Sequence, residues 1–361
     1  MKKSLLALAV LGAFAGAASA QSSVTVYGIM DLGITSIDDG NVAGRTTGIT
    51  SGNQSASRIG FKGTEDLGNG LKANFMLEST IAADAGTTNA TTGMFNRFST
   101  VGLSGNFGAV NLGRQVSAIK DAYDQIDPFG DGGTIAPISQ TFFGGALAGD
   151  NGRISNSIKY TSNSFSGFKF GAAYGFGETA GSTSKNSNAG VNAGYANGPL
   201  NVQFGYHTQD RNPGAAVPGF GGATTAVVDG KSNATFLGAT YDFGVAKLHA
   251  AYGDSKIKDA GKADLKARNY LIGVSAKVGA AGSIMASYSV NDNRTVGALN
   301  ADSKRAAIMY AYDLSKRTNL YAGYSHTSND ANARLGLATG AAVAPNGENA
   351  SVFAVGMRHK F

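Results

Sequence analysis

The chain has 361 residues, of which 52 are glycine and six are proline, with no cysteine or tryptophan. Glycine at about twice its usual frequency, together with only 15% charged residues, argues against an ordinary soluble domain. The absence of cysteine excludes disulfides and thiolate chemistry, and a net charge of +6 is typical of a solvated surface, so no nucleic-acid partner is expected.

The first element in chain order is a short apolar run from Leu5 to Ala18, which follows two lysines and ends in Ala-Ser-Ala. This pattern is typical of a secretory signal peptide with an A-x-A cleavage site. The run is shorter than the ~20 apolar residues that a membrane-spanning helix needs, and no later segment approaches that length. We therefore assign residues 1–20 to a signal peptide and residues 21–361 to one folded domain.

From residue 24 onward the sequence alternates with a period of two. In segment 24–34, most even positions carry valine, methionine, leucine or isoleucine, whereas Thr25, Tyr27 and Asp31 occupy odd positions. Such alternation predicts strands with one apolar and one polar face. Sixteen segments of this kind are centred near residues 29, 59, 75, 101, 111, 157, 171, 192, 204, 238, 250, 273, 286, 309, 322 and 356.

The connections between these segments are of two kinds. Short polar turns such as 65–70, 197–199 and 315–317 alternate with long segments rich in Gly, Ser, Thr, Asn and Asp. Short turns at one rim and long loops at the other are typical of outer-membrane barrels. The long connections are residues 38–54, 82–94, 116–150, 178–187, 208–231 and 328–349.

The composition of the two faces distinguishes a membrane barrel from other β folds. The apolar face is rich in tyrosine and phenylalanine near strand ends, and the other face is mostly small or polar with spaced lysines and arginines. A soluble sandwich would bury its apolar face in a core, and a β-solenoid would repeat with a fixed short period. We expect an all-β fold, a 16-stranded antiparallel transmembrane β-barrel whose outer face contacts outer-membrane lipid.

The last strand strengthens this prediction. Apolar side chains alternate from Phe353 to Phe361, whereas Arg358 and Lys360 have the opposite parity. This ending looks like the C-terminal signature that the outer-membrane insertion machinery reads. Phe361 is therefore the predicted assembly signal, and the insertion machinery is a predicted partner.

Taken together and in order, several segments resemble the general porins of beta-proteobacteria. These segments are Ser22–Gly28, Ser57–Gly68, Val101–Gly105, Asn111–Gln115, Asp313–Thr318 and Arg358–Phe361. The resemblance implies a homotrimer of sixteen-stranded barrels, with an inward-folded long third loop that narrows each lumen. It implies passive passage of inorganic ions and small hydrophilic solutes, with no cofactor.

The predicted constriction has an acidic side and a basic side. Residues 116–150 form the candidate third loop, for which no strand or helix is predicted, and a long unstructured segment in a compact protein is more often functional than idle. The loop contains Asp127 and Asp131. Glu78 has inward parity on the third strand, so it could pair with an arginine and hold it in place.

The basic side is assigned partly by parity and partly by resemblance. Arg58 has inward parity opposite an outward Ile59, and Arg153 has inward parity opposite an outward Ile154. The family places an arginine cluster opposite the acidic loop, and matching flanking residues carry it onto Arg58, Arg97 and Arg153, with Arg114 as a neighbour. Fixed guanidinium groups in a wet constriction raise the local anion concentration, so we expect weak to moderate anion preference.

Catalytic motifs are scarce. The four histidines lie on separate predicted strands, with no zinc-protease or nucleophile-elbow motif, so neither a metal site nor an enzyme is expected. One alternative is an outer-membrane hydrolase in which His207 or His249 meets a serine across strands. Another is an adhesin barrel with a plugged lumen, which would not conduct.

Overall fold

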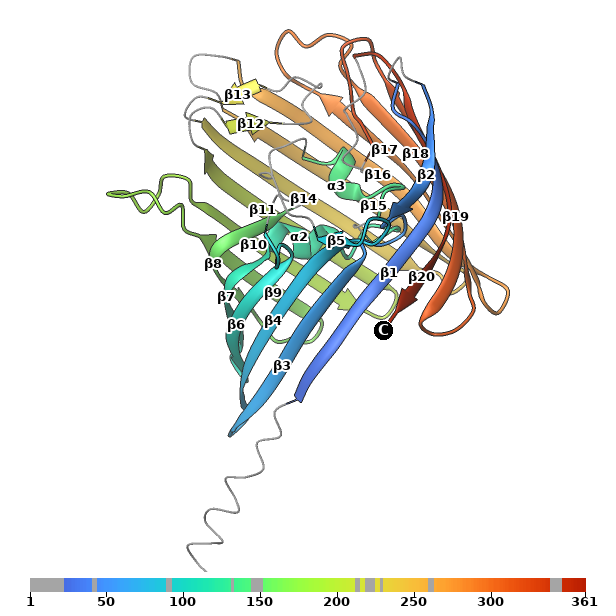
Figure 1. Cartoon of the computed structure of the whole chain (residues 1–361). Helices are drawn as coiled ribbons and strands as arrows, with labels where there is room; N and C mark the ends of the chain where they lie inside the picture. Colours follow the sequence, from blue (N-terminus) through green and yellow to red (C-terminus); the bar gives the residue numbers. More distant parts are fainter. Residues whose placement is uncertain are drawn as a thin grey trace, which may run out of the picture.

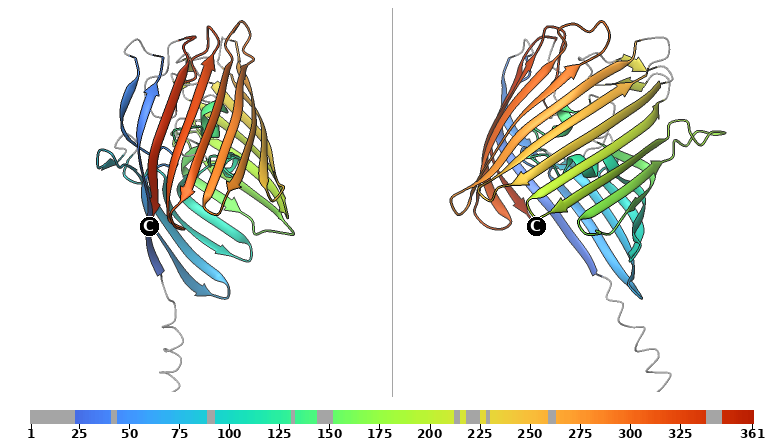
Figure 2. Two further views of the ribbon diagram at one scale, coloured as in Figure 1. Left: turned by 90° about the vertical axis from the view of Figure 1, so that its right-hand side faces the viewer. Right: turned by 180° about the vertical axis from the view of Figure 1, so that it is seen from behind.

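The computed structural model describes residues 23–40, 44–88, 93–130, 133–143, 152–211, 215–217, 225–227, 230–258, 263–337 and 346–361. These residues form a closed antiparallel β-barrel, in which the first strand pairs with the last (Figures 1 and 2). The predicted signal peptide, residues 1–20, lies outside the described residues. No helix in the described ranges is long and apolar enough to cross a bilayer.

The elements follow one another along the chain with two short helices between β7 and β8. They are β1 (Ser23–Asp38), β2 (Thr46–Ser51), β3 (Arg58–Gly68), β4 (Leu71–Ala82), β5 (Thr87–Thr88), β6 (Phe98–Gly105), β7 (Gly108–Val116), α2 (Ala118–Tyr123), α3 (Ile138–Thr141), β8 (Arg153–Thr161), β9 (Phe168–Gly175), β10 (Asn188–Asn197), β11 (Leu200–Arg211), β12 (Ala215–Val217), β13 (Thr225–Val227), β14 (Gly230–Asp242), β15 (Ala246–Ile257), β16 (Leu265–Val278), β17 (Gly282–Asn293), β18 (Ser303–Asp313), β19 (Thr318–Asn329) and β20 (Ala350–Lys360).

The described strands fill sixteen positions around the barrel. β2 and β3 both pair with β1, and β5 and β6 both pair with β4, so each of these couples occupies one position. β12 and β13 pair only with each other, outside the ring. Each of the sixteen predicted segments falls within one barrel strand, which confirms the predicted 16-stranded antiparallel barrel.

The alternation of the sequence becomes an alternation of exposure. Along β18, every second residue is buried, and the exposed set includes Ile308 and Tyr310. The buried set includes Arg305, which is 1% exposed. Large apolar side chains such as Ile308 and Tyr310 thus face outward and the charged Arg305 faces inward, the arrangement expected of a barrel in lipid.

The connection after β7 contains two helices, which corrects the prediction that residues 116–150 have no helix of their own. The hydroxyl of Ser117 caps α2 by accepting a hydrogen bond from the backbone amide of Lys120. Helices this short carry too few turns to produce a periodic apolar pattern, which is why the sequence did not indicate them. Figure 1 shows both helices within the ring of strands.

An apolar cluster fixes this segment against the wall. Ile119 and Tyr123 of α2, with Phe142 and Phe143 after α3, pack on inward-facing residues that include Phe236 of β14. All five of these side chains are buried. Burial of aromatic surface on this scale is the main stabilising contribution available to an otherwise irregular segment.

Hydrogen bonds anchor the second half of the segment. Arg305 of β18 donates from Nη2 to the side-chain oxygen of Gln140 (3.4 Å) and to the carbonyl of Gly336. Its Nε donates to the hydroxyl of Thr327 at 2.9 Å. The same buried guanidinium therefore holds α3 and the connection between β19 and β20.

Candidate functional site

A carboxylate on the inner wall brings three predicted site residues together. Glu78 on β4 accepts hydrogen bonds from the hydroxyl of Tyr27 (2.9 Å) and from Nε of Arg97 (2.5 Å). Nε of Arg58 lies 3.9 Å from the same carboxylate. Glu78 is almost fully buried, and a buried carboxylate needs such partners to remain charged. Tyr27 lies on β1, Arg58 on β3 and Arg97 directly before β6, so four neighbouring positions of the barrel contribute to the group.

Arg114 lies apart from this carboxylate. It pairs in register with Ser99, and the next pair along the same face joins Val101 and Leu112, which are exposed and apolar. Its Nε donates to the carbonyl of Asn96 (2.6 Å). These contacts place it beside the strand ends, on the parity of the outer face.

Arg153 lines a small cavity together with Ser117 and His207. Its neighbour Ile154 is buried against Ala118 of α2 and Ala173 of β9, so the outward position expected for Ile154 is wrong. The cause is a break in the period of two. The register of β7 with β8 shifts between Gly113 and Gln115, and Asn156 has a φ of 50°.

Of the two acids predicted in the third loop, Asp127 and Asp131, the structure describes only Asp127. Asp127 accepts hydrogen bonds from the backbone amides of Phe129 and Ile138, each at 2.9 Å. Its carboxylate thereby ties the two halves of the segment together, and it also lines the cavity described below. Asp131 lies outside the described residues.

A second ion pair attaches the segment to the wall. Nζ of Lys159 on β8 lies 2.5 Å from a carboxylate oxygen of Asp121 and donates to the carbonyl of Val116. Burial raises the pKa of the Asp121 carboxyl above its ordinary value, and the ammonium of Lys159 opposes that shift. The pair therefore positions α2 against the strand that follows it in sequence.

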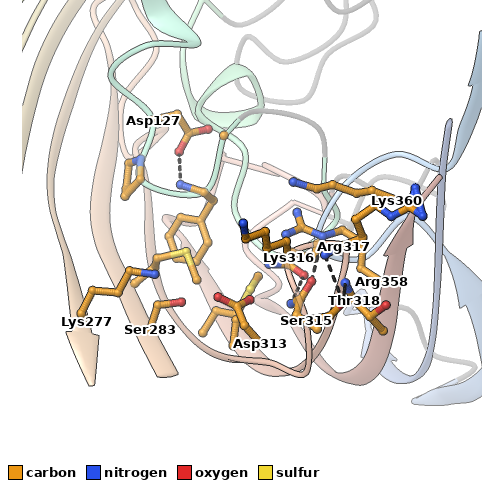
Figure 3. Close-up of a pocket in the computed structure, with 18 residues that line it drawn as sticks. Asp127, Lys277, Ser283, Asp313, Ser315, Lys316, Arg317, Thr318, Arg358 and Lys360 are labelled. Carbon is orange, nitrogen blue, oxygen red and sulfur yellow. Dashed lines mark hydrogen bonds between the residues drawn. The ribbon is translucent and has the colours of Figure 1, made fainter. Parts of the chain in front are cut away.

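A larger basic region lies on the other side of the segment, at the rim of the short turns (Figure 3). It borders an open cavity of about 420 Å³. Two carboxylates line this cavity, those of Asp127 and Asp313. Five cationic side chains line it as well, namely Lys277, Lys316, Arg317, Arg358 and Lys360.

Sequence reasoning found only part of this region. The parity of the last strand indicated that Arg358 and Lys360 face away from the apolar side. Lys316 and Arg317 stand in a short turn, where parity is undefined, and so were missed. The even-numbered residues of β16 face outward, so Lys277, at an odd position, has inward parity. That parity is the signal that could have identified it.

Neighbouring elements fix the orientation of Arg358. Its Nη1 donates to the hydroxyl of Ser55 (2.8 Å), and its Nε donates to the side-chain oxygen of Asn319 (3.0 Å). Ser55 belongs to the excursion between β2 and β3, whose amides at Gln54 and Ser55 donate to the buried carboxylate of Asp31. Because hydrogen bonds hold both Nε and Nη1 of Arg358, its positive charge stays in one position.

The two basic regions are continuous across β1. Ile29 pairs in register with Arg58 on β3 and with Lys360 on β20. Arg58 and Lys360 therefore flank one residue at the same level of the inner wall. The cations therefore form one series along the inner wall, from Arg97 through Arg58 and Lys360 to the cavity at the short-turn rim.

The chemistry available here is electrostatic. Within the described ranges, no three His, Asp or Glu residues are grouped so as to hold a metal ion. One histidine does meet a serine, since His249 Nε2 lies 3.0 Å from the hydroxyl of Ser275. Its Nδ1 lies 2.7 Å from the carbonyl of Ile126, which indicates a role in holding the segment after α2.

Comparison with known proteins identifies relatives over the whole length. A family model described as Gram-negative porin matches residues 7–332. Outer membrane porin protein 32 of Delftia acidovorans is 38% identical over 370 residues, covering 100% of both chains. An outer membrane porin protein of Bordetella pertussis (strain Tohama I) is 34% identical, and the match covers 91% of this chain and 95% of the relative. An anion-selective porin from Comamonas acidovorans superposes with a TM-score of 0.83 at 35% identity, covering 94% of this chain and 100% of the other.

Proposed function

The chain belongs to the Gram-negative porin family, and from that premise we propose that it is an outer-membrane diffusion pore with a weak to moderate preference for anions. It passes inorganic ions and small hydrophilic solutes passively, without a cofactor. The observation that carries the anion preference is the continuous series of cations from Arg97 through Arg58 to Lys360.

The balance of charges supports this direction of selectivity. Of the carboxylates near the series, Glu78 is shared by Arg58 and Arg97, and Asp127 is hydrogen-bonded to two backbone amides. These two acids are engaged with protein groups, and the cavity at the short-turn rim presents five cations against the carboxylates of Asp127 and Asp313. Fixed cations lower the energy of an anion in a narrow aqueous passage and raise that of a cation.

We propose further that residues 117–143 narrow the lumen. The apolar cluster around Phe236, the Lys159–Asp121 ion pair and the hydrogen bonds of Arg305 attach this segment to three different parts of the wall. A segment held in this way excludes part of the cross-section, and its position decides which wall charges border the remaining passage. Arg58, Arg97 and Arg153, with Glu78, Asp127 and Asp131, are the proposed constriction residues. Arg114, also predicted there from the sequence, is left out because its register with Ser99 puts it on the parity of the outer face.

The proposed assembly follows the family. Residues 1–20 direct export, residues 21–361 form the barrel, three copies associate, and the insertion machinery recognises the end that carries Phe361. Outer-membrane lipid covers the apolar outer face, to which exposed side chains such as Ile272 and Leu237 belong.

Reversal potentials in planar bilayers test the proposal. In a KCl gradient, the protein should give a potential of the anion-selective sign, and R58Q/R97Q/R153Q should reduce it without abolishing conductance. The matched control is K72Q/K169Q/K185Q, which removes three cations outside the proposed constriction and should retain most of the preference. A cation-selective sign in the unmodified protein would contradict the proposal, and equal selectivity of the triple variant would place the constriction elsewhere.

A further inference from the structure

The outer surface of β14, β15 and β16 carries a cationic patch at the rim of the long connections. Five side chains form this lysine patch: Lys231, Lys256, Lys258, Lys266 and Arg268. We propose that the lysine patch binds the phosphate groups of a phosphorylated glycolipid in the outer leaflet of the membrane.

The register of β15 with β16 places Lys256 and Lys266 of the patch directly beyond a pair of tyrosines. Tyr252 and Tyr270 are register partners on the outer face, with ring centroids 5.5 Å apart. Tyrosines on the lipid-facing side of a barrel mark the boundary between hydrocarbon and headgroups. Lys256 and Lys266 lie four residues along each strand from these tyrosines, about 14 Å at 3.4 Å per residue. The lysines are therefore at the depth of lipid headgroups.

Lys256 and Lys266 are also direct register partners. Like charges opposite each other on one face of an antiparallel pair destabilise it unless an anion lies between or beside them. The structure supplies one such anion for three lysines. Nζ of Lys256 lies 2.6 Å from the carboxylate of Asp264, and Lys258 and Lys266 act on the same carboxyl, whose pKa is lowered chiefly by the hydrogen bond from Lys256.

The neighbouring acids leave an excess of positive charge. Asp254 lies 3.9 Å from Nε of Arg268, and Asp210 opposes Lys231 in register. Asp292 on β17 opposes Arg268 in register and lies 3.7 Å from Nη1 of Arg294. With Asp264, four carboxylates face the five cations of the patch and the adjoining Arg294. The excess positive charge of the patch lies on the outer face of the barrel, away from solutes inside the lumen.

An amphiphile fits this surface better than a free anion or another copy of the chain. On the hydrocarbon side of the patch the same strands expose Leu248 and Ile272, which suit acyl chains. On the other side the lysines suit phosphate oxygens. Two copies meeting through this face would bring the cations together, which disfavours a second copy as the occupant.

Lipid titration of the intact protein in detergent tests the inference. The probe is hexa-acylated lipid A carrying two phosphates, and native mass spectrometry measures the bound fraction. K256Q/K266Q should bind at least fivefold more weakly than the unmodified protein, whereas K256R/K266R should bind within twofold of it. The matched control K72Q/K169Q removes two lysines at the opposite rim and should bind normally.

Four results would overturn the inference. They are equal binding by K256Q/K266Q, equal binding of lipid A without phosphates, displacement of lipid A by millimolar inorganic phosphate, and a changed oligomeric state of K256Q/K266Q in detergent. The last would assign the patch to contacts between copies. Because the lysine patch faces outward, K256Q/K266Q should keep its conductance and selectivity, so failure here is distinguishable from failure of the proposed pore function.

Discussion

Glu78 shows how one buried carboxylate can position the arginines of the inner barrel wall and offset part of their charge. Its carboxylate engages Tyr27, Arg58 and Arg97, and it does so from a buried position. Two guanidiniums that share one carboxylate keep a net positive charge while their positions become fixed. At this scale, a single acid both organises the arginines and offsets part of their field.

Replacing Glu78 with Gln should therefore have two effects. Anion preference should rise, because one negative charge leaves the wall while both arginines remain. Stability should fall by about 1–3 kcal/mol, because the hydrogen bond of Arg97 loses its charged acceptor and Arg58 loses its ion-pair partner. Reversal potential in a KCl gradient and thermal unfolding measure the two effects. Glu178→Gln, at an exposed loop position, is the control and should change neither; an unchanged preference in E78Q would show that Glu78 does not border the passage.

Parity predicted the inward placement of some residues and failed for others. Arg58 and Glu78 lie in regular stretches of β3 and β4, where alternation determines the face. Near Arg153 the shifted register and the positive φ of Asn156 break the alternation, and no residue-by-residue count anticipates that break. The position of Lys316 beside the cavity could not be predicted from parity, because it depends on how the turn between β18 and β19 folds.

At the scale of elements, glycines on the inner wall make room for the segment after β7. At Gly205 of β11, a Cβ atom would lie 2.8 Å from Ile119 Cγ1 and 3.0 Å from its Cα. At Gly253, a Cβ atom would lie 2.8 Å from the ring of Phe142. The wall is thus shaped to accept α2 and the residues after α3.

Substituting Gly205 with Ala should displace α2. The added methyl group meets helix backbone as well as a side chain, so overpacking of about 1–3 kcal/mol is expected. Single-channel conductance should change, and the temperature of unfolding should fall. Gly48→Ala is the control, since no atom outside its own neighbourhood lies within 4 Å of the added carbon. Unaltered conductance in G205A would argue that α2 does not border the passage.

The end of β20 has a defined partner. The backbone amide of Gly28 donates to the carbonyl of Phe361, and the amide of Phe361 donates to the carbonyl of Gly28, each at 3.1 Å. The phenyl ring lies against Gly28, where a Cβ would collide with it. Phe361 therefore extends the pairing of β1 with β20.

Deleting Phe361 should reduce the amount of protein inserted into outer membranes while synthesis continues. Both hydrogen bonds to Gly28 and the predicted recognition signal are lost together. Quantitative immunoblots of membrane and total fractions measure the ratio. Phe243→Ser, which removes an exposed aromatic from a short turn, should insert normally. Insertion of the deletion variant at the normal level would refute a role for this residue in assembly.

The strand pattern was predictable from sequence because lipid outside and polar groups inside impose the same period on every strand. The helices between β7 and β8 were not, because α2 has six residues and gains its stability from contact with Phe236 and its neighbours. Local propensity is weak in such short elements, and tertiary contacts decide their conformation.

For the whole molecule, the proposed selectivity depends on fields that salt can screen. The Debye length falls from about 10 Å at 0.1 M to about 3 Å at 1 M ionic strength. The ratio of chloride to potassium permeability should therefore approach unity as the mean KCl concentration rises at a fixed gradient. Reversal potentials over that range measure it, and the R58Q/R97Q/R153Q variant should start closer to unity. A ratio independent of salt would mean that pore size, and not fixed charge, discriminates between the ions.

The pairing of β1 with β20 joins residues more than three hundred positions apart, such as Ile29 and Lys360. Until the last strand docks, both strands expose unpaired amides and carbonyls, which are templates for aggregation. Contacts between distant parts of a chain also form slowly, because their closure entropy is lost before they stabilise the fold. The same closure that leaves the finished barrel without an edge therefore makes its folding late and cooperative, and we expect the exported chain to require a holding chaperone until β20 reaches β1.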